Sequence, residues 1–267
     1  MVAFFQQFIL GMVQGIVEWI PFSSEGVLFF VASNFFDETS VDVLLRQALL
    51  LHLGTFFAAL IYFWKDVKVL VKGLFNYKQS DLETKKTLDF LIVATLISGF
   101  VGLAFLQFLN FVSGNFVLTS RIITFFIGGL LIVTGFLQIK ASRRGIRTIY
   151  HLNRGDSVFL GFMQGLAALP GFSRSGLTVS ALLFRRINDT TALKLSFLMS
   201  LPIILLGNIL LNWGEISLAT GMLWGVLFAF VFGLATIHGL MTLSKKVKFG
   251  YFVIIIAILL ILSSFLF

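Results

Sequence analysis

Six apolar segments constrain what this chain can fold into more than any other feature of its sequence. Each is roughly 20 residues long, which is enough to cross the hydrocarbon core of a bilayer. They lie at about 44–63, 88–109, 117–138, 193–211, 219–242 and 249–267. Only 12% of the 267 residues are charged, whereas soluble domains carry about a quarter. The sequence therefore predicts an all-α, polytopic membrane protein with six transmembrane helices.

Two further apolar segments, at about 3–33 and 156–184, are interrupted near their middles by clusters of Pro, Gly and Ser. The first cluster reads PFSSEG and the second PGFSRSG. Pro removes a backbone donor and Gly disfavours the helix, so a continuous helix through either cluster is unfavourable. One interpretation is a kinked spanning helix. The other is a re-entrant hairpin, whose two half-helices enter and leave on the same side of the membrane.

The positions of the basic residues favour the hairpins. Seventeen of the 20 Lys and Arg lie in the polar stretches 64–87, 139–155, 185–194 and 243–248. If both interrupted segments are hairpins, all seventeen fall on one side, which the positive-inside rule identifies as the cytoplasm. We therefore expect a multi-pass protein of the cell membrane whose C-terminus lies outside. This placement also explains the net charge of +8, so we expect no nucleic-acid partner.

The two interrupted segments also resemble each other. A shift of 150 residues, without a gap, gives six identities in sixteen positions. These are Gly11 with Gly161, Gln14 with Gln164, Gly15 with Gly165, Phe22 with Phe172, Ser23 with Ser173, and Gly26 with Gly176. The pattern predicts a repeat over 1–138, a basic linker over 139–155 and a second repeat over 156–267. Each repeat holds one hairpin and three spans, so the second is inverted, and such repeats place a binding site where they meet.

Three charged residues lie well inside the interrupted segments, away from their ends: Glu18, Glu25 and Arg174. A charge at mid-membrane costs roughly 2.5–3.5 kcal/mol, so these residues imply pairing, a ligand, or both. One interpretation is an Arg174–Glu18 ion pair that only locks the repeats together. The other is an anion site, in which the guanidinium acts with the nearby hydroxyls and helix N-termini and for which phosphate is the best ligand. Those hydroxyls belong to Ser173, Ser175 and Thr178.

The first cluster and the helix before it contain the residues that we expect to carry out the chemistry. Glu18 precedes Ser23 and Ser24 closely enough to act as a general base, or it could hold a divalent ion. Gln14 lies one helical turn earlier and faces the same side. Each serine could instead be an ordinary helix N-cap. We interpret His52, in a predicted span, as a helix–helix hydrogen-bond partner.

Two motifs point to a known family. The stretch QGIVEWIPFSSEG resembles the first signature of the undecaprenyl-pyrophosphate phosphatase (bacitracin-resistance protein) family: Glu or Gln, then Glu four residues later, then Pro-x-Ser-Ser. The stretch PGFSRSGLT is similar to the second signature, Pro-Gly-x-Ser-Arg-Ser-x-x-Thr, and matches every fixed position. The resemblance extends over essentially the whole chain, including the inverted repeat.

The resemblance implies an integral-membrane hydrolase that converts undecaprenyl diphosphate, or another polyprenyl diphosphate, to the monophosphate. Such an enzyme recycles the lipid carrier of cell-envelope glycans, uses magnesium or calcium, faces outward and forms a homodimer. The implied catalytic residues are Glu18, Ser24 and Arg174. Of the substrate-binding residues, the resemblance implies Ser173 and Thr178, and the residue pattern adds Ser23, Ser175, Gly171 and Gly176. The predicted metal ligands are Gln14 and Glu18, to which the residue pattern adds Glu25.

The chain departs from the family pattern in the first motif. Bacterial members have Ser-Thr-Gly-His there, whereas this chain has Glu25 for the threonine and Val27 for the histidine. Gln14 also replaces a glutamate, and Glu25 restores that negative charge. The inverted repeat and the lost histidine keep two alternatives open: a polyprenyl-phosphate transporter or flippase, and a non-catalytic lipid-binding relative.

Overall fold

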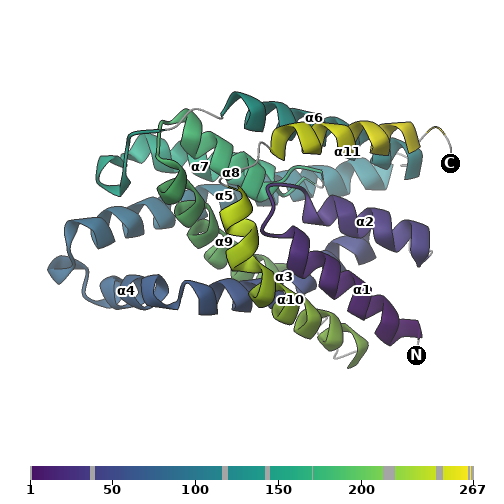
Figure 1. The fold of residues 1–267 in the computed structure, drawn as a ribbon, viewed down its shortest axis with the longest axis horizontal. Coiled ribbons are helices and arrows are strands. Elements are labelled where there is room, and N and C mark those ends of the chain that lie inside the picture. The colour runs from purple at the N-terminus through teal and green to yellow at the C-terminus, as the bar shows by residue number, and fades with distance from the viewer. Residues whose placement is uncertain are drawn as a thin grey trace.

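The computed structural model describes residues 2–36, 40–115, 120–141, 145–169, 171–212, 220–244, 249–263 and 265 (Figure 1). These residues are almost entirely helical, which confirms the all-α prediction. The α-helices are α1 (Val2–Val17), α2 (Ser24–Phe35), α3 (Val41–Tyr62), α4 (Trp64–Phe75), α5 (Leu82–Asn115), α6 (Ser120–Lys140), α7 (Arg154–Leu166), α8 (Arg174–Phe184), α9 (Asp189–Asn212), α10 (Thr220–Ser244) and α11 (Phe249–Ser263). Two short 3₁₀ helices are η1 (Tyr77–Gln79) and η2 (Ile149–His151).

Four helices within the described residues are long and apolar enough to cross a membrane. They are Val43–Tyr62 in α3, Leu82–Leu109 in α5, Asp189–Leu210 in α9 and Gly221–Gly239 in α10. The other two expected spans correspond to α6 and α11, whose apolar parts are shorter. The number of six spans therefore stays a prediction.

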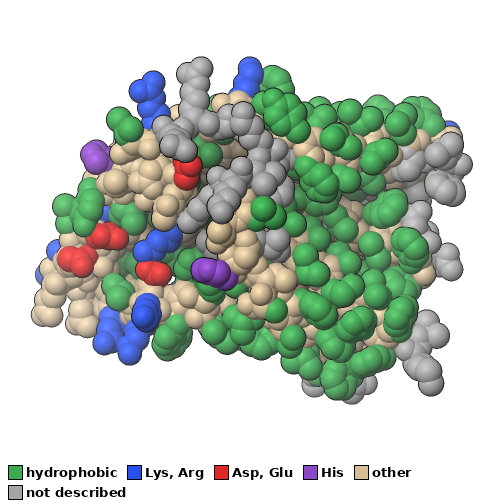
Figure 2. Space-filling model, viewed as in Figure 1, with side chains coloured by type: hydrophobic (Ala, Val, Ile, Leu, Met, Phe, Trp, Pro, Cys, Tyr) green, Lys and Arg blue, Asp and Glu red, His purple; other side chains and the backbone are tan. Residues whose placement is uncertain are grey.

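The surface separates apolar from charged side chains along the long axis of the molecule. Hydrophobic side chains cover the right part of the face shown in Figure 2, whereas charged side chains gather toward the left. The charged end carries the turn between α4 and α5 and the segment that leads into α7, and both termini lie at the opposite end (Figure 1). This separation suits helices that traverse a bilayer with their polar connections in water.

The first interrupted segment is a helical hairpin. Helix α1 ends at Val17, the chain turns through residues 18–23, and α2 begins at Ser24. Leu10 on α1 and Ala32 on α2 belong to one buried cluster although each is several residues from the turn, so the helices run back along each other (Figure 1). The kinked-helix interpretation is therefore wrong for this segment.

The second interrupted segment is a hairpin as well. Helix α7 ends at Leu166 and α8 begins at Arg174; Pro170, which was expected to break the segment, lies outside the described residues. The side chain of Asp156, at the start of α7, accepts a hydrogen bond from Arg185 Nε, just after α8, at 2.6 Å. The start of one helix and the end of the other thus lie together, which a single kinked span would not allow.

Each hairpin packs its glycines against a long helix of the other half of the chain. A Cβ added at Gly11 or Gly15 would meet the backbone of α10, and one added at Gly161 would meet that of α5. Small residues four apart let helices approach this closely. These glycines account for part of the similarity between the two segments. The repeat itself stays a prediction, and these crossed pairings are compatible with it.

The turns of the two hairpins meet at the centre of the molecule. Hydrogen bonds with α10, α6 and α8 fix the first turn there. Trp19 Nε1 donates to the Gly233 carbonyl of α10 at 3.0 Å. Gln138 Nε2 of α6 donates to the Pro21 carbonyl at 2.6 Å, and Ser175 Oγ of α8 donates to the Ile20 carbonyl at 3.2 Å. The backbone around Glu18 is therefore held in place against α8.

Candidate active site

Two helices begin at the meeting point of the hairpins. Ser23 caps α2 by accepting a hydrogen bond from the Gly26 amide at 3.1 Å, and Ser173 caps α8 by accepting one from the Gly176 amide at 3.0 Å. The N-cap interpretation is thus confirmed for Ser23, and the pairing of Ser23 with Ser173 reflects two helix starts. The first residues of these helices, Ser24 and Arg174, line one cavity. The positive ends of both helix dipoles therefore lie close to it.

Glu18 is the centre of the site. Its carboxylate is buried and accepts a hydrogen bond from Ser24 Oγ at 2.9 Å and another from Gln14 Nε2 at 3.1 Å, both on Oε2. Its other oxygen, Oε1, forms an ion pair with Arg174 Nη2. The structure thus brings together Gln14, Glu18, Ser24 and Arg174, which the sequence had predicted to form a site.

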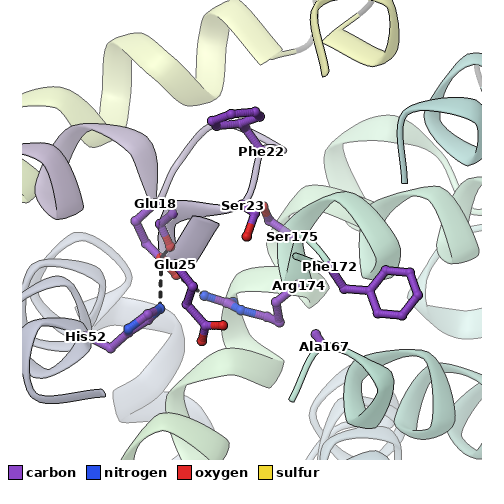
Figure 3. Close-up of a pocket in the computed structure, with 10 residues that line it drawn as sticks. Glu18, Phe22, Ser23, Glu25, His52, Ala167, Phe172, Arg174 and Ser175 are labelled. Carbon is purple, nitrogen blue, oxygen red and sulfur yellow. Dashed lines mark hydrogen bonds and ion pairs between the residues drawn. The ribbon is translucent and has the colours of Figure 1, made fainter. Parts of the chain in front are cut away.

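His52, on α3, is a fourth partner of Glu18. Its Nε2 lies 3.2 Å from Glu18 Oε2, and its Nδ1 lies 2.6 Å from the Ala48 carbonyl oxygen. Figure 3 shows Glu18, Glu25, His52 and Arg174 converging, with the ring of Phe172 turned away from them. The interpretation of His52 as only a helix–helix partner missed its place in this site. The signal available in the sequence was a histidine buried in a span of a chain whose first motif lacks one.

The cavity between these side chains is small, about 20 Å³. This is room for about one water molecule. It is lined by Glu18, Phe22, Ser23, Ser24, Glu25, His52, Ala167, Phe172, Arg174 and Ser175. A phosphate group therefore requires the side chains to move apart.

Two lining groups have unused hydrogen-bonding capacity. Arg174 Nη1 and Glu25 Oε2 are buried, and neither has a hydrogen-bond partner among the described residues. A buried polar atom without a partner costs about 1–3 kcal/mol. Such atoms beside a cavity are available to a ligand that enters it.

The remaining predicted residues lie around the cavity without lining it. Thr178 Oγ1 donates to the Arg174 carbonyl at 2.8 Å and lies 2.6 Å from Ser196 Oγ of α9. Gly171 has a φ of +109°, which suits the turn before α8, and Gly176 packs against α6. These residues shape the start of α8, and so does Ser173 as its cap.

The described residues contain no group of three or more His, Asp and Glu arranged to hold a metal ion. Both oxygens of Glu18 already accept from donors, whereas Oε2 of Glu25 has no hydrogen-bond partner within the described ranges. Magnesium is often bound by one or two carboxylates together with substrate phosphates. One available carboxylate oxygen suits an ion that binds together with a phosphate ligand, and the metal itself stays a prediction.

Fold and site together define a class: a multi-pass membrane protein in which two helical hairpins bring a carboxylate, a serine hydroxyl and a guanidinium into one small cavity. Comparison with known proteins identifies the family. Residues 7–262 match the bacitracin resistance protein BacA family, and the chain belongs to it. The resemblance inferred from the two motifs is therefore confirmed.

Curated relatives match along nearly the full chain. An undecaprenyl-diphosphatase of Methanococcoides burtonii is 40% identical over 271 residues, which cover 100% of both chains. One of Haloarcula marismortui is 34% identical over 245 residues, 90% of each chain. One of Syntrophotalea carbinolica is 34% identical over 253 residues, 91% of each chain.

Proposed function

We propose that the protein is an integral-membrane phosphatase that hydrolyses undecaprenyl diphosphate, or another polyprenyl diphosphate, to the monophosphate and inorganic phosphate. The names of its relatives support this activity and do not favour the transporter or the non-catalytic alternative. The observation that carries the proposal is the geometry of Glu18. One of its oxygens accepts the Ser24 hydroxyl while the other faces Arg174.

Arg174 is the residue that binds the terminal phosphate. Its Nη1 has no hydrogen-bond partner in the part of the chain that the structure describes, and a guanidinium can bind two phosphate oxygens at once. Because the cavity is too small for a phosphate group, the Arg174–Glu18 ion pair separates when substrate binds and the guanidinium turns to the substrate. The N-termini of α2 and α8 add partial positive charge.

Glu18 accepts the proton of the attacking group. When Ser24 attacks, its Oγ forms a bond to the terminal phosphorus and the bond to the bridging oxygen breaks. Polyprenyl monophosphate then leaves, and water hydrolyses the phosphoserine. When a water attacks instead, the same carboxylate takes its proton and inorganic phosphate forms in one step. Magnesium or calcium, held by Glu25 and the diphosphate, would offset the negative charge of the phosphates.

The site opens toward the outside of the cell membrane, and the C-terminus lies outside. This part of the proposal is supported by the charged end of the molecule, which lies opposite both termini (Figures 1 and 2) and which the positive-inside rule assigns to the cytoplasm. The lipid chain lies along the apolar surface, and the reaction recycles a carrier of cell-envelope glycans. The absence of a nucleic-acid partner and the homodimer stay predictions.

The test is phosphate release from undecaprenyl diphosphate and farnesyl diphosphate by the detergent-purified protein, with and without magnesium or calcium. We expect metal-dependent release that Glu18→Ala and Arg174→Ala abolish. Residual release by Ser24→Ala would identify water as the attacking group, and its complete loss would identify Ser24. No release from either diphosphate by the wild-type protein would contradict the hydrolase assignment and favour transport.

A further inference from the structure

The reaction requires Glu18 to lose one of its partners. In the structure, the carboxylate is held by Arg174 on Oε1 and by donors on Oε2. Once the guanidinium turns to the phosphate, only the Oε2 donors can keep Glu18 directed at Ser24. A flexible carboxylate that drifts by about 1 Å can cost 10²-fold in rate.

His52 is a suitable group to hold it. The Ala48 carbonyl can only accept a hydrogen bond, so His52 Nδ1 donates to it at 2.6 Å and the orientation of the ring is fixed. This fixed ring directs Nε2 at Glu18 Oε2, 3.2 Å away. That carboxylate oxygen also only accepts, so Nε2 is placed to donate a hydrogen bond to Glu18.

The position of His52 separates it from the substrate-binding groups. It belongs to α3, which supplies none of the residues that the motifs identify, whereas Ser24 and Arg174 begin α2 and α8. Gln14 also donates to Oε2. It lies on α1, four residues before Glu18 in the first motif. His52 is thus a donor to Oε2 from a helix that carries neither motif.

We propose that His52 is a positioning residue for the phosphatase reaction, which holds Glu18 against Ser24 while Arg174 binds the substrate. This inference rests on the proposed function. It assigns the imidazole of the site to α3 instead of the first motif, where this chain has Val27. That valine packs against a buried apolar cluster, so its side chain has a different role.

The experiment compares phosphate release by wild type, His52→Phe, His52→Gln and His52→Asn. Glutamine carries its amide nitrogen at about the reach of Nε2, whereas asparagine ends near the position of Nδ1. We expect His52→Phe and His52→Asn to lower kcat about 10- to 100-fold, as lost supporting hydrogen bonds do at other sites, with KM changed by less than about threefold. We expect His52→Gln to stay within about fivefold of wild type.

The matched control is His238→Phe. That histidine lies on α10, where its Nδ1 is 2.9 Å from the Tyr62 hydroxyl, away from the cavity, and we expect unchanged kcat. Equal activity of His52→Gln and His52→Asn, unchanged kcat in both, or a rise in KM alone would overturn the inference. His52→Gln and His52→Asn both place a polar amide at the buried position. Comparing their kcat values therefore tests the inference even where His52→Phe does not fold. Absence of release by wild type would refute the proposed function itself, so the two failures are distinguishable.

Discussion

Two buried carboxylates, Glu18 and Asp156, are each paired with arginine, yet their surroundings differ. Asp156 lies at the start of α7 and is fully buried. Arg147 binds both of its oxygens, at 3.1 and 2.6 Å, and Arg185 Nε donates to Oδ1 at 2.6 Å. The backbone N–H of Asn153 also donates to Oδ2 at 3.0 Å. Burial and ion pairing are therefore common to both clusters.

The difference is spare hydrogen-bonding capacity. Around Asp156, Arg147 also donates to the Arg185 and His151 carbonyls. Both of its Nη atoms therefore already have acceptors in the protein. Around Glu18, Arg174 Nη1 and Glu25 Oε2 have no partner in the described part of the chain. The Asp156 cluster thus closes the base of a hairpin, whereas the Glu18 cluster retains groups for a ligand. A buried ion pair alone would not have distinguished the two roles.

The largest effect is expected for Arg174→Ala. Removing a donor that stabilises charge in a transition state costs about 10²- to 10³-fold in kcat, and we expect the upper value because this arginine also binds the phosphate. The thermal midpoint in detergent should fall less than for Arg147→Ala, because removal of Nη1, which has no partner in the described part of the chain, offsets part of the cost of the broken ion pair. A variant that unfolds without a specific loss of phosphate release would assign Arg174 to structure.

Arg147→Ala should show the reverse pattern. Breaking a buried ion pair costs 3–5 kcal/mol, and we expect about 3 kcal/mol because Arg185 remains to pair with Asp156. Denaturant or thermal unfolding in detergent measures the loss, and kcat per folded molecule should equal that of wild type. Full stability of this variant would show that the cluster does not lock the hairpin.

Glu25→Gln should separate stability from activity at a single residue. Removing a buried charge with an unused oxygen is expected to raise the free energy of unfolding by about 1 kcal/mol. Phosphate release should fall about tenfold, and more metal should be needed for half-maximal activity. Titration of magnesium against the initial rate checks this, and an unchanged metal requirement would exclude Glu25 as the ligand.

The smallest effect is expected for the loss of stability at low pH. Asp156 lies outside the candidate spans. Burial by itself would raise the pKa of its carboxyl, but hydrogen bonds from Arg147 and Arg185 outweigh burial and hold that pKa below its ordinary value. The stabilisation is therefore complete above the unfolded pKa, about 3.9, and is lost as the pH falls through the lower folded pKa. Thermal midpoints measured between pH 6 and 3 should fall more steeply for wild type than for Asp156→Asn.

Much of this site could be predicted because its residues lie in two short motifs. The Pro, Gly and Ser clusters predicted the helix breaks, and the 150-residue shift predicted that Glu18 and Arg174 would meet. His52 could not be placed in this way, because its role depends on how α3 crosses α1. The motif pattern also could not tell which hydroxyls line the cavity: Ser175 does, whereas Thr178 is turned toward α9. The Asp156 cluster depends on the path of the linker and was likewise not predicted.

The crossed packing of the hairpins sets the order in which the molecule can assemble during synthesis. Helix α7 follows α5 in the chain, so the surface that receives Gly161 and Gly165 already exists when α7 is made. Helix α1 is made well before α10, the helix on which its glycines pack. The first hairpin must therefore remain in the membrane without these contacts until α10 is made. The turn that carries Glu18 gains its support from α10 only at that later point.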